Sequence, residues 1–257
     1  MIKAIFFDVD GTLLTLGKHI MPESTLNSLK KLREKGIKLF VASARHFSML
    51  KHVTDYFEFD GYILLNGQYC IDREGAVIYD KPIDEKTAYN LKKFLDTKKI
   101  QASFITKTGN YVNELSERLI ETVEEMGIDI PPEIDPLSDD EAIYQLMMYI
   151  DDDSWLDLKK NITGLSFTNR YDKYIEILPE DAGKAKGILK TLKFHNINTK
   201  HTMAFGDSDN DIDMLNLAGY GISMGNGSDN LKKISDYVTD SIDEDGIYKA
   251  LKKLEVI

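Results

Sequence analysis

Two aspartates, Asp8 and Asp10, stand at the end of a short apolar segment near the start of the chain. Residues 2–7 read IKAIFF, and Gly11 follows the second acid directly. A carboxylate can attack phosphorus as a nucleophile, and a second carboxylate can move the proton of a leaving group or of water. Acids that follow a strand are also common turn residues, so the pair acquires a meaning only from the rest of the chain.

Four further apolar segments end in polar side chains in the same way. These segments span residues 37–42, 61–65, 201–205 and 220–224. The polar residues that follow all five segments are Asp8, Asp10, Thr12, Ser43, Arg45, Asn66, Asp207, Asn210, Asp211 and Asn226. In an open parallel sheet, ligands bind outside the carboxyl ends of the strands, near the point where the strand order reverses. We therefore expect these side chains to meet at one edge of a sheet.

Acids gathered at one edge would repel one another, and their pKa values would rise unless a cation lay among them. Mg²⁺ fits such a cluster, because it takes one or two carboxylates, keeps some water and accepts an oxygen of a substrate phosphate. The cluster contains no histidine or cysteine, which argues against zinc. Mg²⁺ is therefore the predicted cofactor.

A bound phosphate also needs positive charge and hydrogen-bond donors. Ser43, Arg45 and Lys184 can supply them, and Gly11 would let backbone amides approach an oxyanion closely. The simpler alternatives are a helix cap for Ser43 and a solvated surface side chain for Arg45 or Lys184, with Lys186 nearby on the same segment.

Two asparagines are candidates for contact with the rest of the substrate. Asn66 precedes Gly67, a common turn pair, and Asn226 follows Gly225 after the last apolar segment. For both residues the sequence leaves a turn role open beside a substrate-binding role.

The elements expected to position these residues alternate between strand and helix. Near-continuous apolar segments indicate strands buried on both faces, as in a parallel sheet covered by helices. Residues 22–36 show the helical alternation, since Leu26, Leu29 and Leu32 repeat at helical spacing and Gly36 supplies a stop signal. Residues 1–80 and 187–257 are therefore predicted to form a doubly wound α/β core.

Residues 81–186 have a different pattern, which predicts an inserted α+β domain. Alternating segments at residues 102–115, 143–151 and 166–178 indicate antiparallel strands, and residues 86–96, 116–127 and 154–162 indicate helices. Pro131, Pro132 and Pro136 are predicted to lie in a surface loop.

Composition excludes several classes of partner. The 257 residues carry a net charge of −11, a surface that in general repels nucleic acid and anionic membranes. The only cysteine, Cys70, cannot form an internal disulfide, and the N-terminus lacks a secretory pattern. We expect a cytoplasmic protein, a monomer or weak homo-oligomer, whose partner is a small phosphorylated metabolite.

These motifs resemble those of the haloacid dehalogenase-like superfamily of phosphatases. DVDGT at residues 8–12, a hydroxyl residue after the second strand, a downstream lysine and GDSDND at residues 206–211 match its four motifs. DGYILLNGQY and the tail ISMGNGSDNLKKISDYVTDSIDEDGI are similar to the Cof-type branch, subclass IIB, and to a Bacteroides hexose phosphate phosphatase within it. The resemblance implies a Rossmann-like core with an inserted cap of the C2B type, which selects the leaving group.

The resemblance also implies a role for each motif residue. Asp8 corresponds to the nucleophile, and Asp10 to the general acid and base that also gives Mg²⁺ its backbone carbonyl. Ser43 and Lys184 correspond to the residues that hold the phosphoryl group. Asp207 corresponds to the principal metal carboxylate, with Asn210 and Asp211 around the metal. The second motif reads ASAR where ATGR is more usual, so Ala44 could alter the turn that aims Arg45.

The predicted function is hydrolysis of a small phosphate ester, with hexose phosphates favoured, through an aspartyl-phosphate intermediate. A sugar phosphomutase of the same superfamily would share this intermediate and differ in its acceptor. A non-catalytic module that binds a metabolite is a third alternative. A dehalogenase is disfavoured, because that chemistry dispenses with the second acid, Asp10 here.

Overall fold

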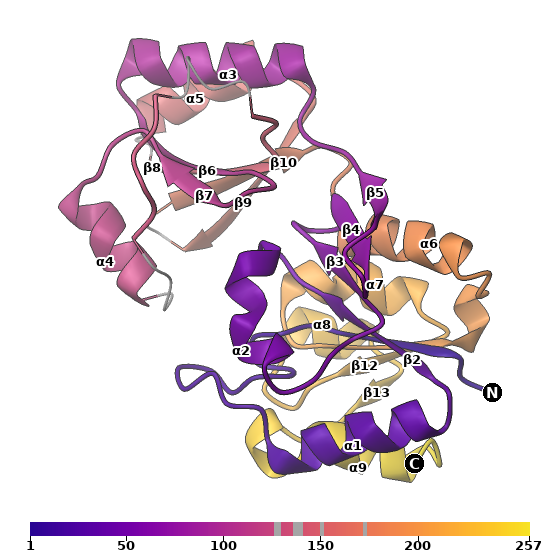
Figure 1. The fold of residues 1–257 in the computed structure, drawn as a ribbon. Helices are drawn as coiled ribbons and strands as arrows, with labels where there is room; N and C mark the ends of the chain where they lie inside the picture. Colours follow the sequence, from indigo (N-terminus) through magenta and orange to yellow (C-terminus); the bar gives the residue numbers. More distant parts are fainter. Residues whose placement is uncertain (126–129, 136–140, 150–151, 172–173) are drawn as a thin grey trace. The chain divides into compact units, whose positions relative to one another are not determined.

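The computed structural model describes residues 1–125, 130–135, 141–149, 152–171 and 174–257 (Figure 1). The chain divides into two compact units, and each is considered by itself. Unit 1 comprises Met1–Asp80 and Gly183–Ile257, and unit 2 comprises Lys81–Ala182. The second boundary falls at Gly183 rather than at the expected residue 187, because the helix that begins at Lys184 packs into the core of unit 1.

Unit 1 is built on one eight-stranded sheet with the strand order β13-β12-β11-β1-β2-β3-β4-β5. Its strands are β1 (Ala4–Phe7), β2 (Lys38–Ala42), β3 (Gly61–Leu64), β4 (Tyr69–Asp72), β5 (Val77–Asp80), β11 (Thr202–Gly206), β12 (Tyr220–Ser223) and β13 (Tyr237–Val238). β1 pairs in parallel with both β2 and β11, so the strand order reverses beside it. The predicted α/β fold with a parallel sheet is confirmed.

One edge of this sheet departs from the parallel pattern. β4 pairs antiparallel with β3, and β5 antiparallel with β4. The connections from Leu65 to Gln68 and from Arg73 to Ala76 are only a few residues long. Connections this short allow a hairpin but not the crossover that a parallel pair requires.

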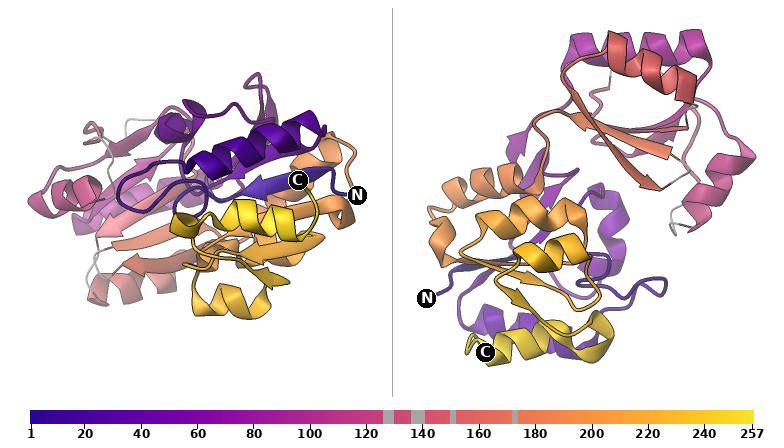
Figure 2. Two further views of the ribbon diagram at one scale, coloured as in Figure 1. Left: turned by 90° about the horizontal axis from the view of Figure 1, so that it is seen from below. Right: turned by 180° about the vertical axis from the view of Figure 1, so that it is seen from behind.

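Helices cover both faces of the sheet (Figures 1 and 2). The helices of unit 1 are α1 (Glu23–Glu34), α2 (Lys51–Thr54), α6 (Lys184–Phe194), α7 (Ile212–Leu217), α8 (Asp229–Ile234) and α9 (Gly246–Lys253), with short 3₁₀ turns at Phe47–Leu50, Thr199–His201, Asp209–Asp211 and Ile242–Glu244. α1 lies beside α9. Side chains of α6, α7 and α8 pack against strand residues. Ile188, Met214 and Leu231 from these helices belong to the same buried hydrophobic cluster as the strands. The near-continuous apolar segments are therefore explained by strands that are covered on both sides.

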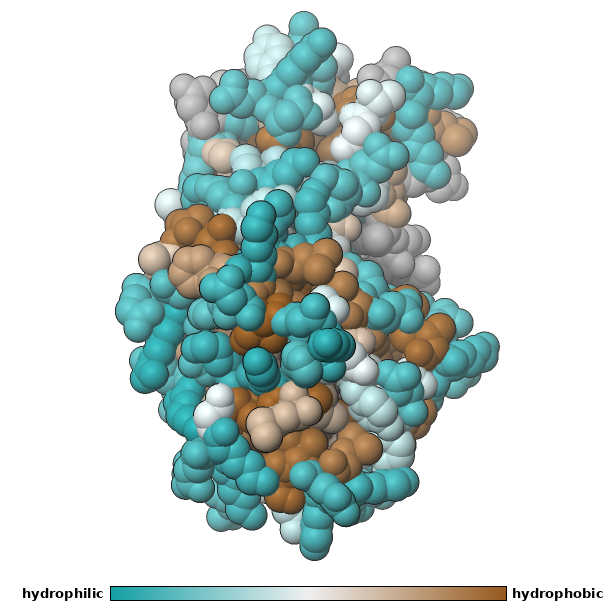
Figure 3. Space-filling model, turned by 90° about the vertical axis from the view of Figure 1, so that its right-hand side faces the viewer, coloured by the Kyte–Doolittle hydropathy of each residue, from teal (hydrophilic) through white to brown (hydrophobic). Residues whose placement is uncertain are grey.

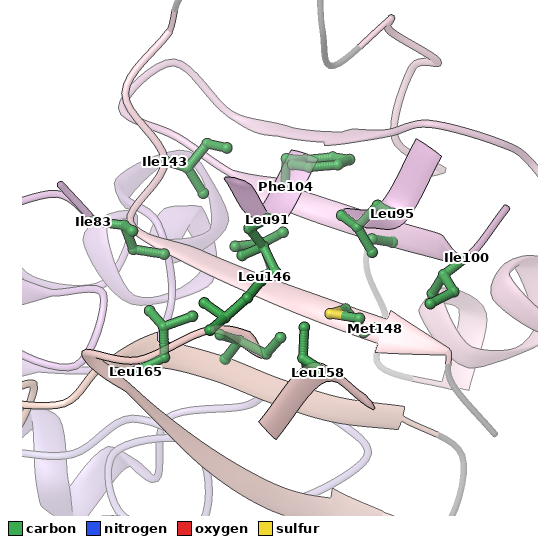
Figure 4. Packing of buried hydrophobic residues seen from close by; sticks show 13 residues of the cluster. Ile83, Leu91, Leu95, Ile100, Phe104, Ile143, Leu146, Met148, Leu158 and Leu165 are labelled. Carbon is green, nitrogen blue, oxygen red and sulfur yellow. The ribbon is translucent and has the colours of Figure 1, made fainter. Parts of the chain in front are cut away.

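Unit 2 is an antiparallel sheet with two of its helices packed on one face (Figure 1). Its strand order is β7-β6-β8-β10-β9, made by β6 (Gln101–Ile105), β7 (Asn110–Val112), β8 (Gln145–Tyr149), β9 (Leu165–Tyr171) and β10 (Tyr174–Pro179). Its helices are α3 (Glu85–Lys98), α4 (Glu117–Glu125) and α5 (Asp152–Asn161). Leu91 and Leu95 of α3 and Leu158 of α5 pack against alternate strand residues such as Leu146 and Met148 (Figure 4). Pro136 and residues 126–127, 150–151 and 172–173 of the expected elements lie outside the described residues.

The surface is largely hydrophilic on the face shown in Figure 3, with apolar side chains in smaller groups between the polar ones. Within the described residues, no helix combines the length and the apolar character that a membrane span requires.

Candidate active site

The first candidate residues lie where the strand order of the sheet reverses. Asp8 follows β1 and Asp207 follows β11, and Phe7, the last residue of β1, is paired in register with Phe205, the last residue but one of β11. The backbone amide of Asp8 donates a hydrogen bond to the carbonyl of Phe205 at 3.0 Å. Parallel pairing therefore places the two carboxylates side by side at the position where ligands bind in open α/β sheets.

Lys184, the first residue of α6, is completely buried beside these acids. Its Nζ donates to Oδ1 of Asp8 at 2.6 Å and to Oδ1 of Asp211 at 2.5 Å. Burial alone would lower the pKa of Lys184, but the carboxylates of Asp211 and Asp8 outweigh it and the pKa is raised. The charged ammonium form is thus favoured, and it is fixed between two acids.

Three carboxylates converge around this ammonium group. One oxygen of each of Asp8, Asp207 and Asp211 lies within 4.8 Å of the other two. Burial, followed by the charges of Asp8 and Asp211, raises the pKa of Asp207 to about 8. Burial also raises the pKa of Asp211 to about 6, although Lys184 opposes that rise. One lysine cannot balance three acids, and a cation beside Asp8 and Asp207 would relieve the remaining repulsion.

Asp211 is held mainly by the protein itself. Its Oδ1 accepts from Lys184, while its Oδ2 accepts from the backbone amides of Asp207 and Ser208 at 3.0 and 3.1 Å. Because both of its oxygens already have protein donors, Asp8 and Asp207 offer the more direct oxygen ligands for a cation. All donors are carboxylate oxygens, the type that Mg²⁺ prefers, so the residues present fit this ion.

The loop after β1 explains the glycine and threonine of the DVDGT motif. Gly11 has a φ of +84°, and a Cβ atom there would lie 2.4 Å from Oδ2 of Asp207. The hydroxyl of Thr12, which is fully buried, donates to Oδ1 of Asp207 at 2.8 Å. Only glycine therefore allows the loop to approach Asp207, and Thr12 fixes the carboxylate once it is there.

Asp10 belongs to a second, more exposed group. Nε and Nη2 of Arg45 donate to its two carboxylate oxygens at 2.8 and 3.0 Å, and Nδ1 of His19 lies 3.6 Å from Oδ1. The side chain of Asp10 is 24% exposed, whereas that of Lys184 is fully buried. Its carboxylate is not among the three that converge around Lys184. The two parallel bonds from Arg45 fix the orientation of this carboxylate.

Ser43 and Ala44 determine the direction of Arg45. The buried Oγ of Ser43 accepts the backbone amide of Arg45 at 3.1 Å. Ala44 is not among the residues with positive φ, so a side chain at that position causes no backbone strain. The turn that was expected to be sensitive to the missing glycine directs Arg45 toward Asp10.

The three asparagine candidates differ in their surroundings. Asn226 donates from Nδ2 to the carbonyl of Gly11 at 2.8 Å, and its Oδ1 accepts the amide of Ile242 at 2.9 Å. Asn66 is buried, and its backbone bonds to Ser43 and to Gly183. Asn210 is exposed, and its Oδ1 accepts the hydroxyl of Ser208 at 2.6 Å. Asn226 therefore fastens the loop after β1, whereas the side chain of Asn210 bonds to its near neighbour Ser208.

Two residues near the site had no signal in the sequence. His19 is a single histidine in a loop, and only its position next to Asp10 makes it relevant. Asp213 lies on α7, where its Oδ2 accepts the amide of Ala185 at 3.0 Å in the first turn of α6. Burial raises the pKa of Asp213. Its place two residues after Asp211 was the only available hint.

Comparisons with known proteins agree with this geometry. A family model described as haloacid dehalogenase-like hydrolase matches residues 5–251. YkrA of Bacillus subtilis is 30% identical over 259 residues, covering 99% of this chain and 98% of that protein. The 5-amino-6-(5-phospho-D-ribitylamino)uracil phosphatase YwtE of Bacillus subtilis is 28% identical over 273 residues, covering 95% of each.

Solved structures give the same result. BT1666, a phosphatase from Bacteroides thetaiotaomicron, superposes with a TM-score of 0.89 at 32% identity, covering 100% of this chain and 96% of its own. The subclass IIB sugar phosphatase BT4131 of Bacteroides superposes with a TM-score of 0.86 at 30% identity, covering 99% and 100%. These findings confirm the prediction of a Cof-type phosphatase. The chain belongs to the haloacid dehalogenase-like hydrolases, and it is a phosphoric monoester hydrolase of that family.

Proposed function

We propose that the protein is a Mg²⁺-dependent phosphatase that hydrolyses sugar phosphates through a phosphorylated Asp8. The observation that carries this proposal is the buried contact of Lys184 with Asp8, made beside Asp207 at the reversal point of the sheet. Mg²⁺ held by Asp8 and Asp207 would neutralise charge on the transferring phosphoryl group and on the acids around it.

Asp8 is the proposed nucleophile because its two oxygens have different surroundings. Oδ1 accepts from Lys184, which leaves Oδ2 to attack phosphorus. The new bond from Asp8 to phosphorus forms as the bond from phosphorus to the ester oxygen breaks, and the electron pair leaves with that oxygen. Lys184 stabilises the charge on the phosphoryl oxygens, assisted by the hydroxyl of Ser43 and the amides around Gly11.

Asp10 is the proposed proton carrier. It donates a proton to the departing ester oxygen, and it then accepts a proton from the water that attacks phosphorus and releases Asp8. In the structure Nε and Nη2 of Arg45 both bond to the carboxylate of Asp10. A substrate phosphate offers Arg45 another anionic partner, so we propose that substrate draws Arg45 away and leaves the Asp10 carboxyl group free for proton transfer.

The sugar specificity draws support from the relatives and from unit 2. BT4131 is a sugar phosphatase, and the substrate in the name of YwtE carries its phosphate on a ribityl chain. In unit 2, Ser103, Gln145 and Glu176 alternate along their strands with residues that pack under the helices, so they lie on the opposite face of the sheet. Buried polar groups on that face suit the hydroxyls of a sugar, and we propose that unit 2 selects the leaving group.

A panel of phosphate esters, assayed for phosphate release with Mg²⁺ and with EDTA, tests this function. We expect the highest kcat/KM for hexose phosphates, and activity only with the metal. Isomerisation of a sugar phosphate without phosphate release would instead indicate a phosphomutase. Equal rates in EDTA would contradict the metal requirement.

The proposal has three further parts. They are a cytoplasmic location, the binding of a small metabolite rather than nucleic acid or membrane, and a monomeric or weakly oligomeric state.

A further inference from the structure

The helix that carries Lys184 begins without a capping side chain of its own. Gly183 occupies the N-cap position of α6 and contributes no side-chain bond. The first amides of a helix need acceptors, and a buried helix start without them is destabilised. A cap is needed here in particular, because any shift of this turn moves the Lys184 ammonium group away from Asp8 and Asp211.

Asp213 provides the missing cap from another helix. Its Oδ2 accepts the amide of Ala185 at 3.0 Å, and a Cβ atom on Gly183 would lie 2.4 Å from that same oxygen. Its other oxygen, Oδ1, is buried and makes no hydrogen bond with any described residue. A carboxylate oxygen left in this state is costly. The bond from Oδ2 to the start of α6 is therefore the contact that offsets this cost.

A second contact fixes the same turn from the opposite direction. The carbonyl of Asn66 accepts the amide of Gly183 at 2.9 Å. A Cβ atom on Gly67 would lie 2.1 Å from the carbonyl oxygen of Gly183, and one on Gly187 would lie 2.8 Å from Cα of Gly67. Backbone packs directly on backbone here, a distance that only glycines permit.

The turn after β3 also reaches the phosphate-binding loop. The amide of Asn66 donates to the carbonyl of Ser43 at 3.2 Å, while its own carbonyl accepts from Gly183. Asn66 thus links the backbone of Ser43 to the backbone of Gly183, the residue that precedes Lys184. These two side chains are the ones proposed to hold the transferring phosphoryl group.

We propose that Asp213 and the glycine contact between the Asn66–Gly67 turn and α6 are the positioning elements of Lys184, and that they set the rate of phosphoryl transfer without touching the substrate. This inference rests on the proposed function. It gives the Asn66–Gly67 pair a backbone role, in which the turn locates the lysine.

A double-mutant cycle tests the inference directly. The rates of p-nitrophenyl phosphate hydrolysis with Mg²⁺ are compared for the wild type, Asp213→Ala, Lys184→Met and the double variant. We expect Asp213→Ala to lower kcat about tenfold with a much smaller change in KM, since misplacement of a group used in the transition state acts on kcat. In the Lys184→Met background the same substitution should change kcat less than about twofold, because the group it positions is absent.

Two further variants separate positioning from general stability. Asp213→Asn keeps an oxygen acceptor for the amide of Ala185 and should restore most of the rate. Asp236→Ala is the matched control. The exposed Asp236 also accepts a backbone amide, that of Gly221 in β12 at 2.7 Å, and it is not part of the contacts at the start of α6. It should lower the melting temperature as Asp213→Ala does while it leaves kcat unchanged.

Gly187→Ala tests the glycine contact even if Asp213→Ala does not fold. Alanine is favoured over glycine inside a helix, so helix formation itself is not impaired. The added methyl group would meet Gly67 and a methyl group of Ile63, and we expect a folded protein with a reduced kcat.

Three results would overturn the inference. They are an equal loss from Asp213→Ala in both backgrounds, a loss no larger than that of Asp236→Ala, and full activity of Gly187→Ala. A wild-type protein that hydrolyses no phosphate ester would overturn the proposed function together with this inference.

Discussion

The two acids of the DVDGT motif are two residues apart and have opposite surroundings. The Asp8 group, made of Asp8, Lys184, Asp207 and Asp211, is buried and holds three carboxylates against one ammonium. The Asp10 group, made of Asp10, Arg45 and His19, is partly exposed, and each of its side chains is between 19% and 25% accessible. The chain turns directly after β1, and this turn, rather than strand alternation, sends the two acids to different environments.

This difference teaches how one short motif supports two kinds of chemistry. A buried carboxylate fixed by a lysine is suited to attack, because little reorganisation is needed when charge moves to the phosphoryl group. A carboxylate near solvent with a displaceable arginine is suited to exchange protons. Substitutions that affect one group and leave the other unchanged therefore test whether the Asp8 group and the Asp10 group have separate roles.

Asp8→Asn should have the largest effect. Asparagine keeps the shape and an acceptor for Lys184, but its amide is a poor nucleophile. We expect a loss of about 10⁴-fold or more in kcat, the scale seen when a nucleophile is removed. Phosphate release from a sugar phosphate under Mg²⁺ measures it. Hydrolysis at the native rate would show that Asp8 is not the nucleophile.

Asp10→Asn should separate the two groups by its dependence on the leaving group. With a sugar phosphate, we expect a loss of about 10²- to 10³-fold, the usual contribution of a general acid. The leaving group of p-nitrophenyl phosphate needs no proton. With this substrate the phosphorylation of Asp8 should remain fast, whereas the hydrolysis of phosphorylated Asp8 should become slow. Rapid-mixing assays should then show a burst of one p-nitrophenol per enzyme. Equal losses on both substrates without a burst would remove the distinction between Asp8 and Asp10.

The sequence predicted the Asp8 group better than the Asp10 group, and the reason is physical. Asp8 and Asp207 end adjacent parallel strands, so the pairing of β1 with β11 fixes their proximity once the strands are recognised. Lys184 was chosen over Lys186 by its position in the motif that the chain shares with the family. The structure brings these residues together, while their catalytic roles stay predictions.

The Asp10 group depends on loop geometry, which leaves no periodic signal. His19 lies in a loop with a φ of 51°, and nothing in its neighbours indicates that it approaches Asp10. Arg45 was expected to meet substrate, and its contact with Asp10 depends on a single turn after β2. The same limit applies to Asp213, because a cap donated by a different helix cannot be inferred from local sequence.

Arg45→Lys should have an intermediate effect that falls on the Asp10 group alone. Lysine keeps the charge but cannot form the two parallel bonds that Nε and Nη2 make with Asp10. We expect a loss of about tenfold in kcat/KM, since a lysine cannot hold the Asp10 carboxylate in the same orientation. Lys190→Arg is a suitable control, because Lys190 lies over the ring of Tyr79 on the outer part of α6. An unchanged kcat/KM would show that Arg45 does not influence the proton carrier.

The smallest predicted effect is a shift in the melting temperature of Asp207→Asn. This measurement tests the Asp8 group without substrate. Burial and the neighbouring acids raise the pKa of Asp207 to about 8, well above its ordinary value of 3.8. Between those values the folded protein keeps a proton that the unfolded chain has lost, so this group makes the metal-free protein less stable as pH rises. Asparagine cannot ionise and can still accept the hydroxyl of Thr12. We therefore expect Asp207→Asn in EDTA to raise the melting temperature by a few degrees at pH 8 and to leave it nearly unchanged at pH 4.

Added Mg²⁺ should reverse the order of the two proteins. The cation neutralises the ionised acids of the wild type and should raise its melting temperature, whereas Asp207→Asn should respond weakly, because it lacks one of the two proposed carboxylate ligands. Asp209→Asn is the control from the same segment. Hydrogen bonds from Ser228 and Asn230 lower the pKa of this exposed acid, so its replacement should produce no gain at pH 8. A wild type whose melting temperature ignores Mg²⁺, or an Asp207→Asn variant that is less stable at pH 8 in EDTA, would mean that repulsion within the Asp8 group is not what a cation relieves.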